Sequence, residues 1–259
     1  MPDKKRVLVL QHIHDNPAGR VGAILNEYEV FYHLIHIGRD HLPDPTRYDA
    51  IVVLGGAAHL YDTQRYPYSI HEEAYLHQAI RQGVPYLGMC LGGQLLAKAF
   101  NAEVKKLPKY HIGFLKIHFT EDGKNDPLYE GFESYQLAFQ WHADCFELPA
   151  GAVSLAHHSQ GFNQSFRYGE RAYGLQYHCE LTEEVLDLWL HEPSMKKEFI
   201  DLYGIEKYEQ TERDAVDLFP TYAQHATHML KNFFKLSEVI SLSQLFPEIK
   251  PVFSSLSST

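Results

Sequence analysis

The cysteine of the segment GMCLG is the side chain of this sequence best placed to act as a nucleophile. Gly88 and Gly92 stand two residues before and two residues after Cys90. Glycines at this spacing favour the tight strand-to-helix turn that exposes the residue at its centre. At the N-terminus of a helix, the helix dipole would favour the thiolate, which is the reactive form of cysteine. The alternative is a small buried residue in a packing turn.

His178 and Glu180 could serve such a thiol as a base and as the group that orients the base. They lie in the stretch GLQYHCE, where Cys179 separates them. Side chains alternate between the two faces of a strand, so an extended segment points His178 and Glu180 to one side and Cys179 to the other. Acyl transfer by cysteine needs this combination of groups. A metal site and a strand with satisfied polar side chains are the competing interpretations of the stretch.

Two backbone N–H groups could stabilise the oxyanion that forms when a thiolate attacks a carbonyl carbon. The N–H of Leu91 follows the cysteine directly and would point into the same space. Gly55 and Gly56 close the apolar run DAIVVL and carry no side chain that would keep a second N–H away. The sequence therefore predicts an oxyanion hole at this glycine pair and Leu91.

The ends of neighbouring strands have to bring these groups together. Short apolar runs predict strands at 6–11, 32–37, 49–54 and 84–89, and the spacing of apolar residues predicts helices at 69–81 and 91–100. Strands that are apolar throughout and alternate with helices indicate a parallel sheet covered on both faces. The expected fold class is therefore α/β, with a mostly parallel central sheet.

The second half of the chain has a different pattern of predicted secondary structure. Short strands with tight turns are predicted at 116–119, 135–141, 152–157, 164–169 and 172–178, as antiparallel edge strands of the same sheet.

Beyond them the chain turns helical. Thr182 can cap a helix, and residues 222–235 predict another. We expect one domain over residues 1–181 and a helical extension over residues 182–259 that packs on it.

Composition restricts the partners of the protein. The 259 residues include 23 Lys and Arg against 33 Asp and Glu, and the net charge of −10 argues against nucleic acid or an anionic membrane as a partner. No apolar run approaches the roughly 20 residues that cross a bilayer, and the start lacks the apolar core of a signal peptide. We therefore expect a cytoplasmic protein that acts on a small molecule. Three widely spaced cysteines and 17 scattered histidines indicate neither a disulfide framework nor a metal site.

Several motifs in the same order resemble the class I glutamine amidotransferase family, especially the glutaminase half of GMP synthase and its stand-alone relatives. GMCLGGQLLA is similar to the nucleophile motif of the family, and GLQYHCE is similar to its Q-[FY]-H-P-E motif. Supporting segments are GGAAHLYDTQRYP, WHADCFELPAGA and NQSFRYGERAYGLQ. The resemblance covers roughly residues 6–181 and implies the flavodoxin-like class I glutaminase fold.

The resemblance also implies a mechanism without a cofactor. Cys90 would attack the γ-carboxamide of glutamine, His178 would act as base and then as acid, and Glu180 would orient His178. A γ-glutamyl thioester would form, release ammonia and be hydrolysed by water.

The family's other site residues carry over as well. Gly56 and Leu91 match its oxyanion hole, and Gln94 matches a glutamine that holds the substrate. The backbone around Gln140, Trp141 and His142 matches the loop that reads the α-amino and α-carboxylate groups. As alternatives, Trp141 is a core residue, and His142 and Asp144 are structural members of a turn.

Two departures from the family leave the function open. Cys179 stands where family members usually have proline, and no pyrophosphate loop of an ATP-dependent synthase is present. We expect any synthase that uses the ammonia to be a separate protein. Alternatively, the same triad would hydrolyse γ-glutamyl peptides or glutathione conjugates without a partner. A non-catalytic regulatory binding module is the third hypothesis.

Overall fold

A single sheet organises the part of the chain that the computed structural model describes, residues 5–158 and 161–245. Its nine strands lie in the order β2-β1-β3-β4-β9-β8-β7-β5-β6. The strands are β1 (Arg6–Gln11), β2 (Phe31–His36), β3 (Ala50–Val53), β4 (Tyr86–Met89), β5 (Val104–Phe119), β6 (Tyr135–Phe146), β7 (Val153–His157), β8 (Asn163–Tyr168) and β9 (Ala172–Leu175).

The sheet consists of a parallel half and an antiparallel half that meet at β9. Strands β2, β1, β3, β4 and β9 pair in parallel, whereas β9, β8, β7, β5 and β6 pair antiparallel. β3, β4 and β9 are buried along their whole length, as expected for parallel strands covered on both faces. The antiparallel half is larger than the sequence predicts, because β5 starts twelve residues earlier than the segment 116–119.

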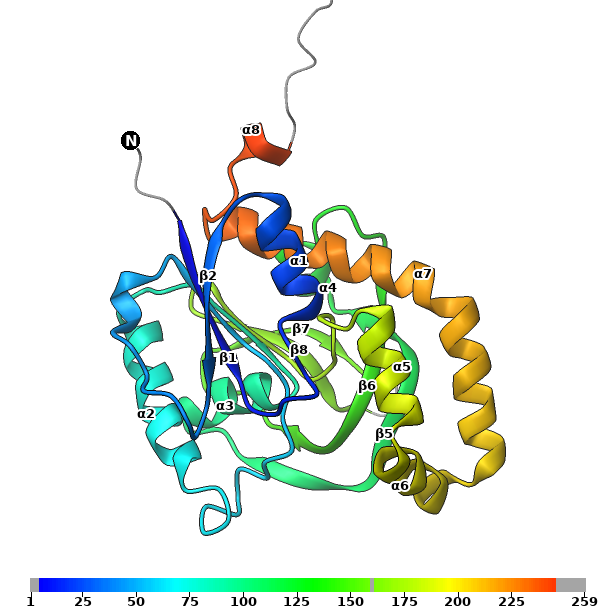
Figure 1. Ribbon diagram of the computed structural model, residues 1–259. Coiled ribbons are helices and arrows are strands. Elements are labelled where there is room, and N and C mark those ends of the chain that lie inside the picture. The colour runs from blue at the N-terminus through cyan, green and yellow to red at the C-terminus, as the bar shows by residue number, and fades with distance from the viewer. Residues whose placement is uncertain (1–4, 159–160, 246–259) are drawn as a thin grey trace, which may run out of the picture.

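Helices cover both faces of the sheet, as Figure 1 shows. On one face, Val7 and Val9 of β1 belong to a core that includes residues of α1, α5 and α7; on the other, Leu8 and Leu10 pack in a core with α2 and α3. The α/β fold class with helices on both faces is therefore confirmed. The helices are α1 (Gly19–Glu27), α2 (Tyr68–Arg81), α3 (Leu91–Ala99), α4 (Glu121–Lys124), α5 (Glu183–His191), α6 (Pro193–Tyr203), α7 (Ile205–Leu236) and α8 (Leu242–Leu245), with 3₁₀ turns η1 (Pro45–Arg47) and η2 (Pro127–Tyr129).

The C-terminal helices are more extensive than the sequence predicts. α7 has 32 residues and contains Pro220, whereas a helix was expected only over residues 222–235. Pro220 is exposed, and Figure 1 shows α7 running along the right edge of the molecule and then across its top. A long helix that curves around a core can accommodate an exposed proline, so α7 continues through Pro220. The domain division at residue 181 stays a prediction.

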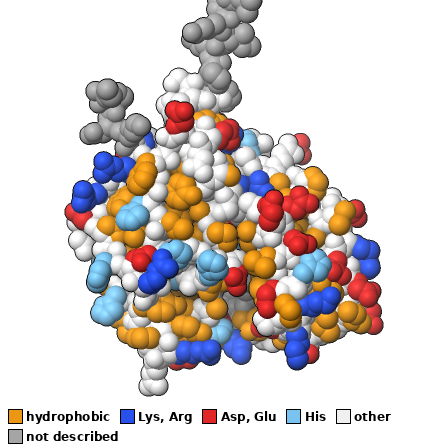
Figure 2. Space-filling model, in the orientation of Figure 1, with side chains coloured by type: hydrophobic (Ala, Val, Ile, Leu, Met, Phe, Trp, Pro, Cys, Tyr) orange, Lys and Arg blue, Asp and Glu red, His pale blue; other side chains and the backbone are white. Residues whose placement is uncertain are grey.

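The surface carries charges of both signs. On the face in Figure 2, described basic side chains are scattered among acidic and apolar ones. Within residues 5–158 and 161–245, no helix is long and apolar enough to cross a membrane.

Candidate active site

Cys90 occupies a strained turn between β4 and α3. Its backbone has φ 51° and ψ −105°, which a non-glycine residue rarely adopts, and its N–H donates to the carbonyl of Leu175 at 2.8 Å. The flanking glycines permit this turn, because a Cβ on Gly88 would collide with the backbone of Gly92 and a Cβ on Gly92 would collide with that of Val53. The turn places the thiol at the N-terminus of α3, as the spacing of glycines predicts.

His178 and Glu180 follow the end of β9 and contact one another. His178 Nδ1 lies 2.7 Å from Glu180 Oε1, and the N–H of Cys179 donates to Glu180 Oε2 at 2.9 Å. Both side chains are buried. The backbone N–H of His178 also donates to the carbonyl of Phe139 in β6 at 2.9 Å, so the segment is tied to the antiparallel half of the sheet.

The charges of this pair stabilise each other. Burial alone would lower the pKa of His178, but the charge of Glu180 and interactions with Cys90 and Glu180 raise it to about 10. Burial alone would raise the pKa of Glu180, but the charge and hydrogen bond of His178 lower it. We therefore describe the pair as an imidazolium and a carboxylate at neutral pH.

Cys179 points away from this pair. Its Sγ lies 3.0 Å from the Sδ of Met89, and the side chain is fully buried in the core on the α1 and α7 face. Burial raises the pKa of its thiol well above the ordinary value. Its environment is that of an inert core cysteine.

A cavity of about 590 Å³ brings most of the predicted site residues together. The predicted residues that line it are Cys90, His178, Gly56, Gln94, Trp141 and His142. Other lining residues are Ile13, Asp15, Asn16, Ala57, Ala58, His59, Arg65, Tyr66, Tyr110, Ala143, Asp144, Trp189, Met195 and Glu198.

The remaining predicted residues surround this cavity without lining it. Glu180 lies behind His178, and the side chain of Leu91 packs in the core on the α2 and α3 face. The amide of Gln140 is buried between Gln164 and His142, at 2.9 and 2.8 Å. Gln94 does line the cavity, and in the described part of the chain its side-chain amide makes only long contacts within hydrogen-bonding range, at 3.5 Å to the carbonyl of Asp144 and 3.4 Å to the amide oxygen of Gln176.

His142 is a second buried histidine of the cavity, with neutral partners. Its Nδ1 lies 2.8 Å from the carbonyl of Asp144 and its Nε2 lies 2.8 Å from the amide of Gln140. Burial lowers its pKa to about 3. The carboxylate of Asp144 turns instead to His59 Nδ1, at 2.7 Å, which links β6 to the loop after β3.

The glycine pair after β3 lets its loop approach the side chains of His178 and Leu91. A Cβ on Gly55 would lie 2.6 Å from His178 Cε1, and a Cβ on Gly56 would lie 2.7 Å from His12 Cβ and 2.8 Å from Leu91 Cδ2. His12 in turn forms a buried pair with Glu72 of α2 at 2.9 Å. A larger residue at either position would displace the loop from the site.

The loop after β1 and the helices after β9 supply residues that the sequence analysis missed. Asn16 Nδ2 donates to Glu180 Oε1 at 3.0 Å, and Trp189 packs edge-on against His178 with ring centroids 5.0 Å apart. The Trp189 indole N–H donates to the carbonyl of Asp15 at 2.7 Å. The position of Asn16 after a buried strand was an available signal, since ligands of open α/β sheets bind at the carboxyl ends of strands. The position of Trp189 on an amphipathic helix gave no such signal in the sequence.

α7 anchors the chain where it leaves the pair. The Leu181 N–H donates to the Tyr222 hydroxyl at 3.2 Å. Arg20 of α1 donates to the Leu181 carbonyl and to Thr227 Oγ1, both at 3.1 Å. These contacts fix the residues directly after Glu180 to α1 and α7.

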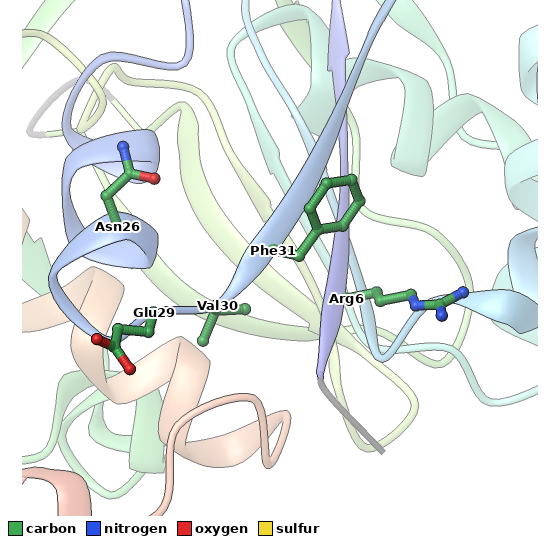
Figure 3. A pocket seen from close by; sticks show the side chains of 5 residues that line it. All are labelled: Arg6, Asn26, Glu29, Val30 and Phe31. Atoms are coloured by element: carbon green, nitrogen blue, oxygen red, sulfur yellow. The ribbon is translucent and has the colours of Figure 1, made fainter.

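A larger depression, of about 680 Å³, lies at the opposite, amino ends of the parallel strands. Figure 3 shows its lining side chains spread apart around it: Arg6, Asn26, Glu29, Val30 and Phe31. This set contains no histidine or cysteine, so the cavity at Cys90 is the better candidate for chemistry. Among the described residues, no group of three His, Cys, Asp or Glu is arranged to hold a metal ion.

Comparisons with known proteins agree with this assignment of the fold. The family model "Glutamine amidotransferase class-I" matches residues 23–192. The chain is 26% identical to a glutamine amidotransferase from Thermotoga maritima of known structure, with a TM-score of 0.77 over 90% of this chain and 98% of that one.

Curated relatives cover shorter stretches. The glutamine amidotransferase-like protein YfeJ of Salmonella typhimurium is 32% identical over 163 residues, 62% of this chain and 68% of that protein. A GMP synthase of Nitratiruptor is 32% identical over 51% of this chain but only 25% of its own length. The γ-glutamyl-L-1-hydroxyisopropylamide hydrolase of a Pseudomonas species is 30% identical over 52% of this chain and 48% of its own. The resemblance inferred from the motifs is thereby confirmed.

Proposed function

The chain belongs to the class I glutamine amidotransferase family of enzymes, and on this premise we propose that it cleaves the γ-amide of glutamine through a thioester on Cys90. The observation that carries the proposal is the shared cavity of a strained cysteine turn and the buried pair of His178 and Glu180. Membership of an enzyme family weighs against a purely regulatory binding module.

The proposed reaction starts with attack of Cys90 Sγ on the γ-carbonyl carbon. The resulting oxyanion would be held by the N–H groups of Gly56 and Leu91. As the tetrahedral intermediate collapses, the carbon–nitrogen bond breaks, His178 gives its proton to the nitrogen, and ammonia leaves. Water then attacks the thioester, His178 takes a proton from it, and glutamate and the free thiol are released.

Glu180 would keep His178 in the orientation and protonation state that these steps need. Its carboxylate accepts from Nδ1, so Nε2 faces the cavity side, where it is buried without a partner among the described residues. The role is that of the aspartate in serine hydrolases.

For the glutamate part of the substrate, we propose Gln94 and the backbone of residues 140–142 as contacts. Gln94 makes only long protein contacts, so its amide is available to a ligand. Trp141 is half-buried against Trp189 and Phe199, which suits a wall of the pocket better than a mobile platform. His142 is held neutral and would position this backbone.

A second candidate function is hydrolysis of γ-glutamyl amides whose amine is larger than ammonia. Beside His178 the cavity continues to Trp189, Met195 and Glu198, and its volume of about 590 Å³ lies in the range of sites for drug-sized ligands. The Pseudomonas relative is named for an activity of this kind. Such an enzyme would need no synthase partner.

If glutamine is the substrate, we propose that the enzyme which consumes the ammonia is a separate polypeptide. We also propose a reducing compartment such as the cytoplasm, because all three cysteines are free.

The test is a comparison of glutamine with γ-glutamyl isopropylamide and γ-glutamyl dipeptides, using the purified protein and acid-quenched mass spectrometry. We expect a γ-glutamyl adduct on Cys90 and release of ammonia or amine. Cys90→Ala should lose at least about 10⁴-fold in kcat, and Cys145→Ala, which removes another buried thiol, should not. Full activity of Cys90→Ala would overturn the mechanism. Faster turnover of the isopropylamide than of glutamine would select the second function.

A further inference from the structure

Asn16 is a buried amide that touches the catalytic pair and lines the same cavity. It lies in the loop between β1 and α1, and its side chain is fully buried. Its Nδ2 donates at 3.0 Å to Glu180 Oε1, the same oxygen that lies 2.7 Å from His178 Nδ1.

The chemistry of the carboxylate fixes which way this amide faces. An ionised carboxylate only accepts hydrogen bonds, so the nitrogen of Asn16 has to face Glu180. The oxygen, Oδ1, therefore faces elsewhere, and it is buried without a hydrogen-bond partner in residues 5–158 and 161–245. An unpaired buried acceptor is destabilising, so its presence in a cavity wall indicates a donor on the ligand.

Asn16 is also a neighbour of His178, the residue that would give its proton to the leaving group. A Cβ on Gly55 would lie 3.2 Å from Asn16 Nδ2 and 2.6 Å from His178 Cε1, so the two side chains are neighbours. His178 gives its proton to the departing nitrogen, and groups beside it are therefore closest to that nitrogen. The neighbouring residue, Asp15, is held by the indole of Trp189 at 2.7 Å, which keeps the loop in place.

We propose that Asn16 Oδ1 accepts a hydrogen bond from the N–H of the scissile amide and of the amine that leaves. The nitrogen gains a proton from His178 as the carbon–nitrogen bond breaks, and it then becomes a stronger donor. The hydrogen bond therefore strengthens towards the transition state, where it accelerates the reaction. Asn16 itself neither gains nor loses a proton. This inference rests on the proposed function of Cys90 and His178.

The test compares an amide with an ester, because the leaving oxygen of an ester carries no hydrogen during attack. Asn16→Ala removes both the contact to Glu180 and the proposed contact to the leaving nitrogen. We expect kcat/KM for glutamine to fall about tenfold or more beyond the fall for glutamate γ-methyl ester. The ratio of kcat/KM values reports acylation, since deacylation of the common thioester follows it.

Asn232→Ala is the matched control. Asn232 is also buried, but its amide donates to the carbonyls of Leu128 and Glu130 in another part of the fold. We expect this variant to keep the wild-type ratio of amide to ester. Should Asn16→Ala fail to fold, Asn16→Ser gives the same comparison, because its hydroxyl is too short to reach both partners.

Equal losses for amide and ester in Asn16→Ala would show that Asn16 acts only through Glu180 and would overturn the proposal, as would no loss for either. Absence of Cys90-dependent turnover of both substrates by the wild type would overturn the proposed function, and this inference with it.

Discussion

The two halves of the sheet each bring one buried histidine to the same cavity, and the two have opposite protonation. His178 follows β9, at the end of the parallel half, and its pKa is raised to about 10 against the effect of burial. His142 lies in β6 of the antiparallel half, and burial lowers its pKa to about 3.

The difference comes from the partners of each ring and not from its depth. His178 faces the carboxylate of Glu180 and the thiol of Cys90, whereas His142 faces a backbone carbonyl and the amide of Gln140. A neutral imidazole can satisfy both of the latter, provided that the amide presents its nitrogen to the unprotonated ring atom. A buried histidine with a charged partner can therefore carry a proton at neutral pH, whereas one with neutral partners stays uncharged and serves as a structural element.

Replacing each histidine by glutamine should give the largest difference in activity between the two sites. We expect His178→Gln to reduce kcat at least about 10⁴-fold, because it removes the group that we propose exchanges protons with the leaving nitrogen and the water. His142→Gln should change kcat less than about tenfold and act mainly on KM through the backbone of residues 140–142. Steady-state kinetics with glutamine or the preferred γ-glutamyl amide measures both. Comparable kcat losses in the two variants would contradict the assigned roles.

The pH dependence of unfolding should separate the two histidines by sign. A raised pKa in the folded state gives stability that is fully present below about pH 6.5, the ordinary histidine value, and is lost as the pH rises towards 10. The lowered pKa of His142 acts the other way. Stability falls as the pH drops from about 6.5 to 3, because in this range only unfolded His142 binds the proton.

Urea unfolding from pH 4 to pH 10 measures these contributions. We expect His178→Gln to flatten the alkaline side of the stability profile and His142→Gln to flatten the acidic side. If both variants have the same stability profile as the wild type, neither ring is coupled to folding in this way.

The smallest effect is expected at Cys179, the residue beside His178 that faces the other way. Cys179→Ser should change kcat less than about threefold and lower the stability by about 1–2 kcal/mol, because a hydroxyl is less well accommodated next to Met89 in an apolar core. Thermal unfolding and steady-state kinetics test both parts. A loss of activity like that expected for Cys90→Ala would contradict the separation of the two thiols.

The arrangement of Cys90, His178 and Glu180 could be predicted because it depends on local rules. The glycines around Cys90 specify a turn, and alternation along an extended segment separates Cys179 from its neighbours. The parallel strands β1, β3 and β4 were predictable for a similar reason, since a continuous apolar run reports burial on both faces. The segment 172–178 was predicted wrongly as an antiparallel edge strand: its β9 lies inside the sheet and pairs in parallel with β4.

Features that depend on tertiary packing could not be predicted in this way. α1 starts without a side-chain cap, so the sequence carries no start signal for it, and the proline in α7 imitates a helix end. Asn16 and Trp189 reach Glu180 and His178 only because tertiary packing brings the loop after β1 and the helix α5 to the segment after β9. The residues 246–259 of the predicted extension lie outside the described part of the chain.

The anchoring of the segment after Glu180 by α7 has a consequence for the order in which the enzyme matures on the ribosome. Tyr222 and Thr227, which hold this segment directly and through Arg20, are translated after Cys90, His178 and Glu180. At roughly 5–20 residues per second the nascent chain carries the three proposed catalytic residues for some seconds before their anchor emerges. Activity should therefore appear late during synthesis, when α7 has left the exit tunnel and docked.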